Sequence, residues 1–186
     1  MSGPHSIGDH LVDLDWLQKN HTQLHPFGLG FLQLKLNETE RIHFWHPGFV
    51  REREEVHNHR YDFMSTVLRG EMQQSLYVFK TGVEHPTHEL FETDCAPGQE
   101  GSQPVISLGL LSPIFSTTIT EGNTYRISHE VLHRIDAKKC VTFLRRESKV
   151  KSHASVVRDI GGRSICPFAE DIPAAEMWAM IEDCLK

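Results

Sequence analysis

Two short histidine patterns are the residues in this sequence best suited to hold a metal ion. His129 and His133 lie in the pentapeptide HEVLH, which fits the pattern H-E-x-x-H. On a helix this spacing places both imidazoles on one face, beside a glutamate that can activate a metal-bound water. His57 and His59 form a second pattern, H-x-H, which on a strand directs both imidazoles to the same side. The elements around each pattern decide between a helical zinc site and a β-sheet metal site.

Both patterns need support from their surroundings, because the 186-residue chain holds 13 histidines and chance matches are frequent. The alternative for H-x-H is a surface strand with two solvated histidines. Around H-E-x-x-H, a turn at 121–123 and a strand at 140–144 leave room for only a short helix, and no third histidine follows at the spacing of zinc proteases. A zinc hydrolase is therefore the least favoured interpretation. His43 and His46 alternate with aromatic residues and are interpreted as structural or exposed.

Short segments of alternating polar and apolar residues, separated by glycine and proline, predict an all-β fold. FLQLKL at 31–36 and RIHFWH at 41–46 form a predicted hairpin. Further predicted strands are 54–59, 64–70, 72–79, 88–93, 105–111, 114–120 and 140–145. This spacing is typical of a sandwich, jelly roll or barrel, whereas the middle of the chain offers no helices for a parallel α/β fold. The aromatic residues expected to pack the barrel are Trp45, Phe63, Phe79 and Phe115.

A short helix is predicted near each end of the chain. The first covers 6–19, with Ser6 as its cap, and the second begins at Pro173. The buried stripe expected on the second helix consists of Ala175, Met177, Met180 and Ile181. The whole chain, 1–186, is predicted to be one domain, with a helical extension over about 1–25, a barrel over 28–160 and a helical segment over 161–186.

Composition excludes several classes of function. The net charge of -6, with acids and bases interspersed, argues against a nucleic-acid binder. No apolar run reaches membrane length, and the first residues lack the pattern of a signal peptide, so a cytoplasmic protein is expected. The four cysteines are widely spaced, which favours reduced thiols over a disulfide framework or a cysteine zinc site.

The order of these features resembles a known superfamily. The H-x-H run is followed by a strand that ends in Gly70, and much later Gly122 is followed by His133. This succession, over residues 57–70 and 122–135, resembles the two motifs of the cupins. The resemblance implies a double-stranded β-helix, which is a small jelly-roll barrel, with one metal ion inside. It also implies a possible homodimer formed through edge strands.

Carried over residue by residue, the resemblance assigns the metal to His57, His59 and His133. His129 and Glu130 would then lie in a connecting loop at the rim of the site. Most cupins add a glutamate ligand, but its place in this sequence falls at Phe63 or Met64, neither of which suits a hard metal ion.

Within the superfamily, Tyr125 and His133 look like the second motif of cysteine dioxygenase and related thiol dioxygenases. Those proteins use three histidines and no glutamate. The strand at 140–144 lacks the histidine and tyrosine that this branch carries there. Cysteine itself is therefore not the substrate that the sequence favours.

Three neutral imidazoles leave up to three positions open on an octahedral ion, which suits iron(II); zinc, nickel or manganese would also fit. The favoured function is an iron(II) dioxygenase that acts on a small polar molecule. A cupin without redox chemistry, either an isomerase or epimerase or a module that binds a metal or small ligand, is the alternative. The residues predicted to support the metal ligands or contact the substrate are Glu55, Asp62, Tyr77, Tyr125 and Arg69.

Overall fold

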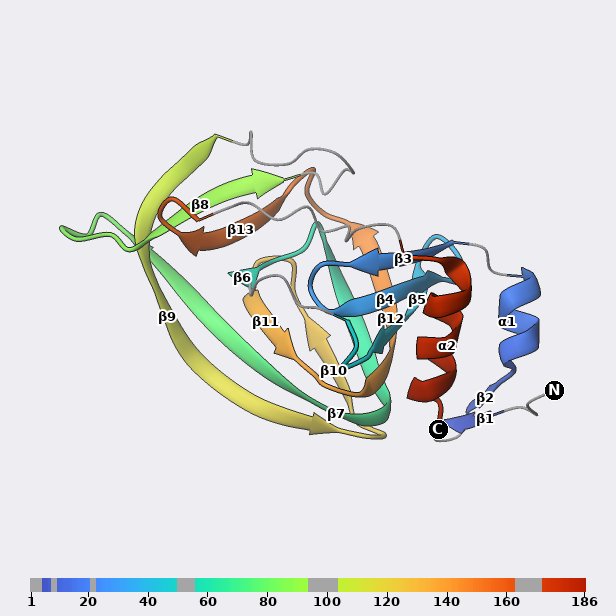
Figure 1. Cartoon of the computed structure of the whole chain (residues 1–186). Coiled ribbons are helices and arrows are strands. Elements are labelled where there is room, and N and C mark those ends of the chain that lie inside the picture. The colour runs from blue at the N-terminus through green and yellow to red at the C-terminus, as the bar shows by residue number, and fades with distance from the viewer. Residues whose placement is uncertain (1–4, 8–9, 21–22, 50–55, 94–103, 163–171) are drawn as a thin grey trace.

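The computed structural model describes residues 5–7, 10–20, 23–49, 56–93, 104–162 and 172–186. Within these ranges antiparallel strands dominate, with one helix toward each end (Figure 1). The strands are β1 (His5–Ile7), β2 (His10–Val12), β3 (Leu24–Phe27), β4 (Phe31–Lys35), β5 (Glu40–Trp45), β6 (Val56–His57), β7 (Tyr61–Thr81), β8 (His88–Thr93), β9 (Val105–Thr120), β10 (Thr124–Ile127), β11 (Leu132–Asp136), β12 (Cys140–Lys149) and β13 (Ala154–Asp159). The helices are α1 (Leu14–Asn20) and α2 (Ala174–Cys184). The predicted all-β jelly-roll class with two short helices is confirmed.

The long strand β7 joins the two parts of the sheet. Its first half pairs with β10 and β12, and its second half pairs with β9 and β11. The sequence predicted two strands separated at Gly70, but the strand runs through this glycine. Gly70 has a φ of 78°, and a Cβ atom there would lie 2.5 Å from the carbonyl oxygen of Lys139. A glycine therefore lets β7 bend while it stays paired.

Part of the sheet closes on itself. The pairings lead from β7 through β9, β8, β13, β6 and β11, and β11 pairs again with β7. In Figure 1, β7 and β9 run side by side and curve around one end of the molecule, opposite the two helices. Closure matters for the site because it places β6 beside β11, although these strands are far apart in sequence.

The predicted hairpin is confirmed as β4 and β5, and one of its faces forms the largest core cluster. Leu32, Leu34 and Phe44 have no exposed surface, and α2 covers them with Met177 and Ile181. Ala175, predicted to lie in the buried stripe of α2, is exposed instead, because the buried side of the helix follows Met177, Ile181 and Cys184. No helix in the described part of the chain is long and apolar enough to span a membrane.

The first predicted helix begins later than expected. Residues 5–7 and 10–12 pair as β1 and β2, and α1 covers only Leu14–Asn20. The side chain of Asp13, rather than Ser6, caps it by accepting a hydrogen bond of 2.9 Å from the backbone of Trp16. An aspartate at this position satisfies a backbone N–H that the helix leaves without a partner.

Other strand predictions need correction in their extent. The segments 105–111 and 114–120 form one strand, β9, whose register shifts opposite Leu76 and Tyr77, where Pro113 is accommodated. Phe115, predicted to pack inside, is 54% exposed. Strands β3, β10, β11 and β13 were not predicted. The described cysteines, Cys140 and Cys184, are buried free thiols; Cys95 and Cys166 lie outside the described residues.

Candidate metal centre

Three histidines lie close together, two on the paired strands β6 and β11 and one just beyond the end of β6. His57 of β6 is the direct register partner of His133 of β11, and His59 follows two residues after His57. The ring centroids lie 5.0 Å apart for His57 and His59, 5.1 Å for His57 and His133, and 5.0 Å for His59 and His133. One nitrogen from each ring lies within 4.8 Å of the other two. The sequence prediction of these three residues as one group agrees with this geometry.

The protonation state of this three-histidine group (His57, His59 and His133) suits metal binding. Burial lowers the pKa of His59 and of His133 well below the usual value, and the neighbouring imidazoles lower both further. The rings of His59 and His133 are therefore neutral near pH 7, and each has a nitrogen lone pair to offer. The Nε2 atoms of His59 and His133 are 2.9 Å apart. Two nitrogens bound at about 2.1 Å and a right angle to one ion would be separated by about 3.0 Å, so this pair fits adjacent ligands.

Aromatic side chains pack against the three-histidine group, and one of them, Phe63, lies at one of the two positions where the glutamate ligand of most cupins would fall. Phe63 is 2% exposed, and its ring meets His59 edge-on with centroids 4.8 Å apart. The ring centroids of Tyr61 and His59 lie 5.6 Å apart. Among the described residues, no carboxylate joins the histidine group, and the buried Nδ1 of His133 has no hydrogen-bond partner. Glu55, predicted to support the metal ligands or contact the substrate, lies outside the described residues.

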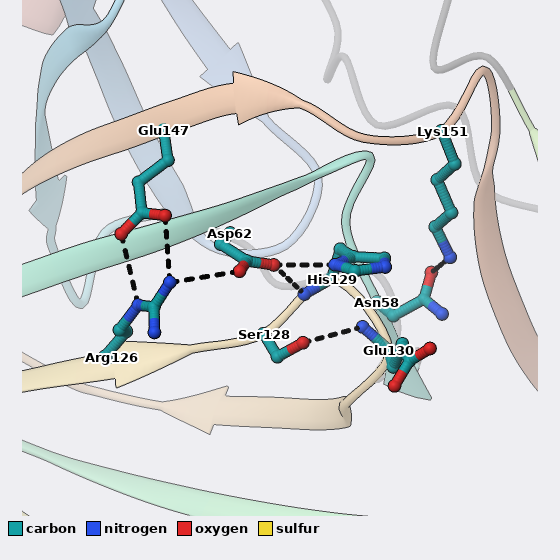
Figure 2. A network of polar contacts seen from close by, with 8 residues as sticks. All are labelled: Asn58, Asp62, Arg126, Ser128, His129, Glu130, Glu147 and Lys151. Atoms are coloured by element: carbon teal, nitrogen blue, oxygen red, sulfur yellow. Dashed lines mark hydrogen bonds and ion pairs between the residues drawn. The ribbon is translucent and has the colours of Figure 1, made fainter.

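Asn58 fixes the segment that carries the first two histidines. Its buried side-chain oxygen accepts hydrogen bonds from Lys151 Nζ at 2.9 Å and from the backbone N–H of Ser155 at 2.6 Å. The backbone N–H of Asn58 donates to the carbonyl of Ser155 at 2.9 Å. Figure 2 shows the Lys151 side chain extending to the side-chain oxygen of Asn58. The sequence interpretation missed this role, since only the pairing with β13 reveals it.

The HEVLH pentapeptide is not helical. His129 lies in a loop and His133 in β11, so the interpretation as a zinc helix is wrong. His129 instead binds Asp62, whose Oδ1 accepts hydrogen bonds from the His129 backbone at 2.8 Å and from Nδ1 at 2.6 Å (Figure 2). Both hydrogen bonds lower the pKa of the Asp62 carboxyl, and the bond from the His129 backbone has the larger effect. Arg126 links the same carboxylate to Glu147.

The other residues predicted to support the metal ligands or contact the substrate are engaged elsewhere in the fold. Asp62 is engaged with His129 rather than with the three-histidine group. Tyr125 packs 6.2 Å from Phe63, and burial raises the pKa of Tyr125 to about 12. Tyr77 is the register partner of Leu132, on the opposite face from His133. Arg69 donates to the carbonyl oxygens of Leu185 and Lys186, beyond α2, and not to the site.

A second set of polar side chains, absent from the sequence prediction, lies beside the histidines. We call Gln33, Arg41, His43 and Trp45 the polar wall; they come from β4 and β5. Arg41 donates to Gln33 at 3.0 Å and to the hydroxyl of Tyr61 at 3.4 Å. Strand alternation places positions 41, 43 and 45 on one face, which is the pattern that would have identified them. His43 is therefore neither exposed nor part of the helix-covered core.

Comparisons with known proteins give distant structural likeness only. No protein-family model and no curated protein matches the chain. It is similar to a hydroquinone 1,2-dioxygenase in complex with Cd2+ and 4-hydroxybenzonitrile, at 14% identity and a TM-score of 0.34, over 61% of each chain. It is also similar to hydroquinone 1,2-dioxygenase from Sphingomonas sp. TTNP3 with 4-hydroxybenzoate bound, at 14% identity and a TM-score of 0.32, over 61% of this chain and 63% of the other. The chain thus covers less than two thirds of either structure, and neither gives support for the thiol dioxygenase branch.

Proposed function

We propose that this chain is a cupin-type metalloenzyme that binds one divalent ion through His57, His59 and His133. The native ion is iron(II), and the reaction joins dioxygen to a small polar molecule. The convergence of three imidazoles, two of them kept neutral by burial, without a carboxylate among the described neighbours, is the observation that carries the proposal. A three-histidine face leaves half of an octahedral coordination sphere for other ligands.

The roles of the surrounding residues follow from their contacts. When bound, iron(II) in such a site supplies open positions for a bidentate substrate and dioxygen. Phe63 and Tyr61 pack against His59 and keep water away from its inner side. Asn58 holds the H-x-H segment against β13, so that His57 and His59 stay directed toward His133. A homodimer and a cytoplasmic location stay predictions from the sequence.

Metal analysis combined with oxygen uptake tests this function. Protein purified without oxygen should contain about one equivalent of iron, and oxygen consumption should depend on a substrate from a panel of small thiols, diketones and hydroquinone. Because affinities follow the Irving–Williams order, the zinc and nickel contents are measured in the same samples. Tight zinc without oxygen uptake, after reloading with iron(II), would support the cupin without redox chemistry instead.

A further inference from the structure

Arg41 is a buried cation whose described hydrogen-bond partners are both neutral. The residue is only 9% exposed, and its guanidinium donates hydrogen bonds to the amide oxygen of Gln33 and to the hydroxyl of Tyr61. No ion pair joins Arg41 to an acid within the described ranges of the chain. A buried charge is unfavourable unless an opposite charge lies beside it. The described acid that acts on Arg41 is Glu38, which is exposed and pairs with Arg146, so Arg41 has no buried counter-charge among the described residues.

Several buried side-chain nitrogens of β5, β7 and β11 have no hydrogen-bond partner among the described residues. The atoms are Arg41 Nε, His43 Nε2, Trp45 Nε1 and Gln74 Nε2, in addition to Nδ1 of His133. Arg41 and Trp45 are both less than a tenth exposed, as is Gln74. Native proteins leave few such groups unpaired, so several of them on neighbouring strands indicate missing acceptors.

These donors border the same space as the histidines. Gln74 is the register partner of Ile135, two residues beyond His133 and thus on the same face of the sheet. From the other side, Tyr61 contacts both Arg41, 5.7 Å from its ring centroid, and the ring of His59. Phe31 contacts the rings of His43 and Trp45 with centroids 4.6 Å away in each case. The polar wall is thus the continuation of the metal-binding face.

We propose that the polar wall binds the carboxylate of a small organic acid whose remaining oxygen-bearing part is directed toward the three histidines. This assignment names the substrate class and rests on the proposed function. A planar guanidinium with neutral donors around it matches a carboxylate, which carries one charge and two acceptor oxygens. A phosphate dianion would leave one negative charge without a partner here. Trp45 and Gln74 then donate to a second oxygen of the same acid.

Binding of small acids to the metal-free protein tests the proposal separately from the metal. Acetate, pyruvate and malonate are titrated into chelator-treated protein and followed by amide NMR, with acetamide and pyruvamide as uncharged matches. Pyruvate should bind at least tenfold more tightly than pyruvamide, and Arg41→Gln should weaken pyruvate binding at least tenfold. Arg145→Gln is the matched control, because the Arg145 side chain is 67% exposed on the neighbouring strand.

Three results would overturn the assignment: no saturable binding of any of the acids, equal binding of acid and amide, or equal affinity in Arg41→Gln and wild type. If Arg41→Gln does not fold, the wild-type indole N–H signal of Trp45, assigned with Trp45→Phe, decides the matter. That signal should shift with pyruvate while those of Trp16 and Trp178 stay in place; an unmoved Trp45 signal contradicts the proposal.

The same titration in His133→Ala separates the two proposals. We expect this variant to lose its metal and to keep its affinity for pyruvate within about threefold. If wild-type protein binds pyruvate at Arg41 but holds no metal, only the metalloenzyme function fails. If it holds iron but binds none of the acids, only the carboxylate site fails.

Discussion

Strands β6 and β11 present two faces with opposite character. On one face His57 and His133 meet, and several buried polar groups on the neighbouring strands have no partner within the described part of the chain. On the other face Val56 and Leu132, the adjacent residues in the chain, pack with Val157 in an apolar cluster. A cavity of about 490 Å3 adjoins that cluster, lined by residues that include Tyr77, Phe79 and Leu90. Period-two alternation alone separates the two environments.

The contrast indicates that stability and chemistry are divided between the faces. Apolar burial stabilises the fold, at roughly 25 cal/mol for each Å2 removed from water. Unpaired buried donors oppose folding, since each loses its hydrogen bonds to water. The apolar face therefore supports strands whose other face keeps its donors available for a ligand. Variants on each side should separate these contributions.

The largest effect is expected from His133→Ala. Loss of one of three imidazoles should lower metal affinity at least a hundredfold, because the remaining pair cannot form a facial site. Calorimetric titration with zinc, together with metal analysis, measures the change. His129→Ala is the control and should keep affinity within a few fold, because His129 contacts Asp62 instead. Similar losses in both variants would restore the H-E-x-x-H interpretation.

Leu132→Ala tests the apolar face at the residue next to the ligand. The truncation should lower the free energy of unfolding by about 2–4 kcal/mol, as for other buried leucines. Urea unfolding of metal-free protein measures it. Metal affinity under native conditions should change less than threefold. A large loss of metal affinity would show that the two faces are not independent.

Asn58→Ala should affect both properties to a smaller degree. Lys151 and the Ser155 backbone would lose their acceptor, which should cost about 1–3 kcal/mol of stability. Because Asn58 holds the H-x-H segment, metal affinity should fall about tenfold. Asn58→Asp keeps an acceptor oxygen at this position and should recover most of both losses. If Asn58→Ala leaves metal affinity unchanged, the asparagine has no positioning role.

The smallest expected effect is a pH dependence that originates in the polar wall. Burial, and to a smaller degree the charge of Arg41, lower the pKa of His43 to about 3. As the pH falls from about 6.5 toward 3, the unfolded chain takes up a proton that the folded chain does not, so stability decreases. The contribution of one histidine is at most about 1.4 kcal/mol for each pH unit. Urea unfolding between pH 6.5 and 4.5 measures how the free energy of unfolding changes with pH. This change should be smaller for His43→Phe than for wild type, and an equal change would contradict the assignment.

Sequence patterns predicted the parts of the site that depend on short-range geometry. H-x-H on a strand and a late histidine after a glycine turn were enough to group His57, His59 and His133. The hairpin followed from alternation and its turn. Arg41 was missed because strand alternation says which residues share a face, and not which face surrounds the site. The continuity of β7 through Gly70 was missed because only the packing of Lys139 shows what the glycine allows.

The meeting of β6 and β11 has a consequence for how the protein folds. His59 and His133 are 74 residues apart in sequence, and in the folded chain their contact depends on the closed ring of strands that joins β6 to β11 and β7. Contacts of such long sequence separation form slowly, because the chain loses much of its freedom before they stabilise it. The complete set of three histidines should therefore be among the last features to appear during refolding. The rate at which refolding chains gain metal affinity would report that final closure.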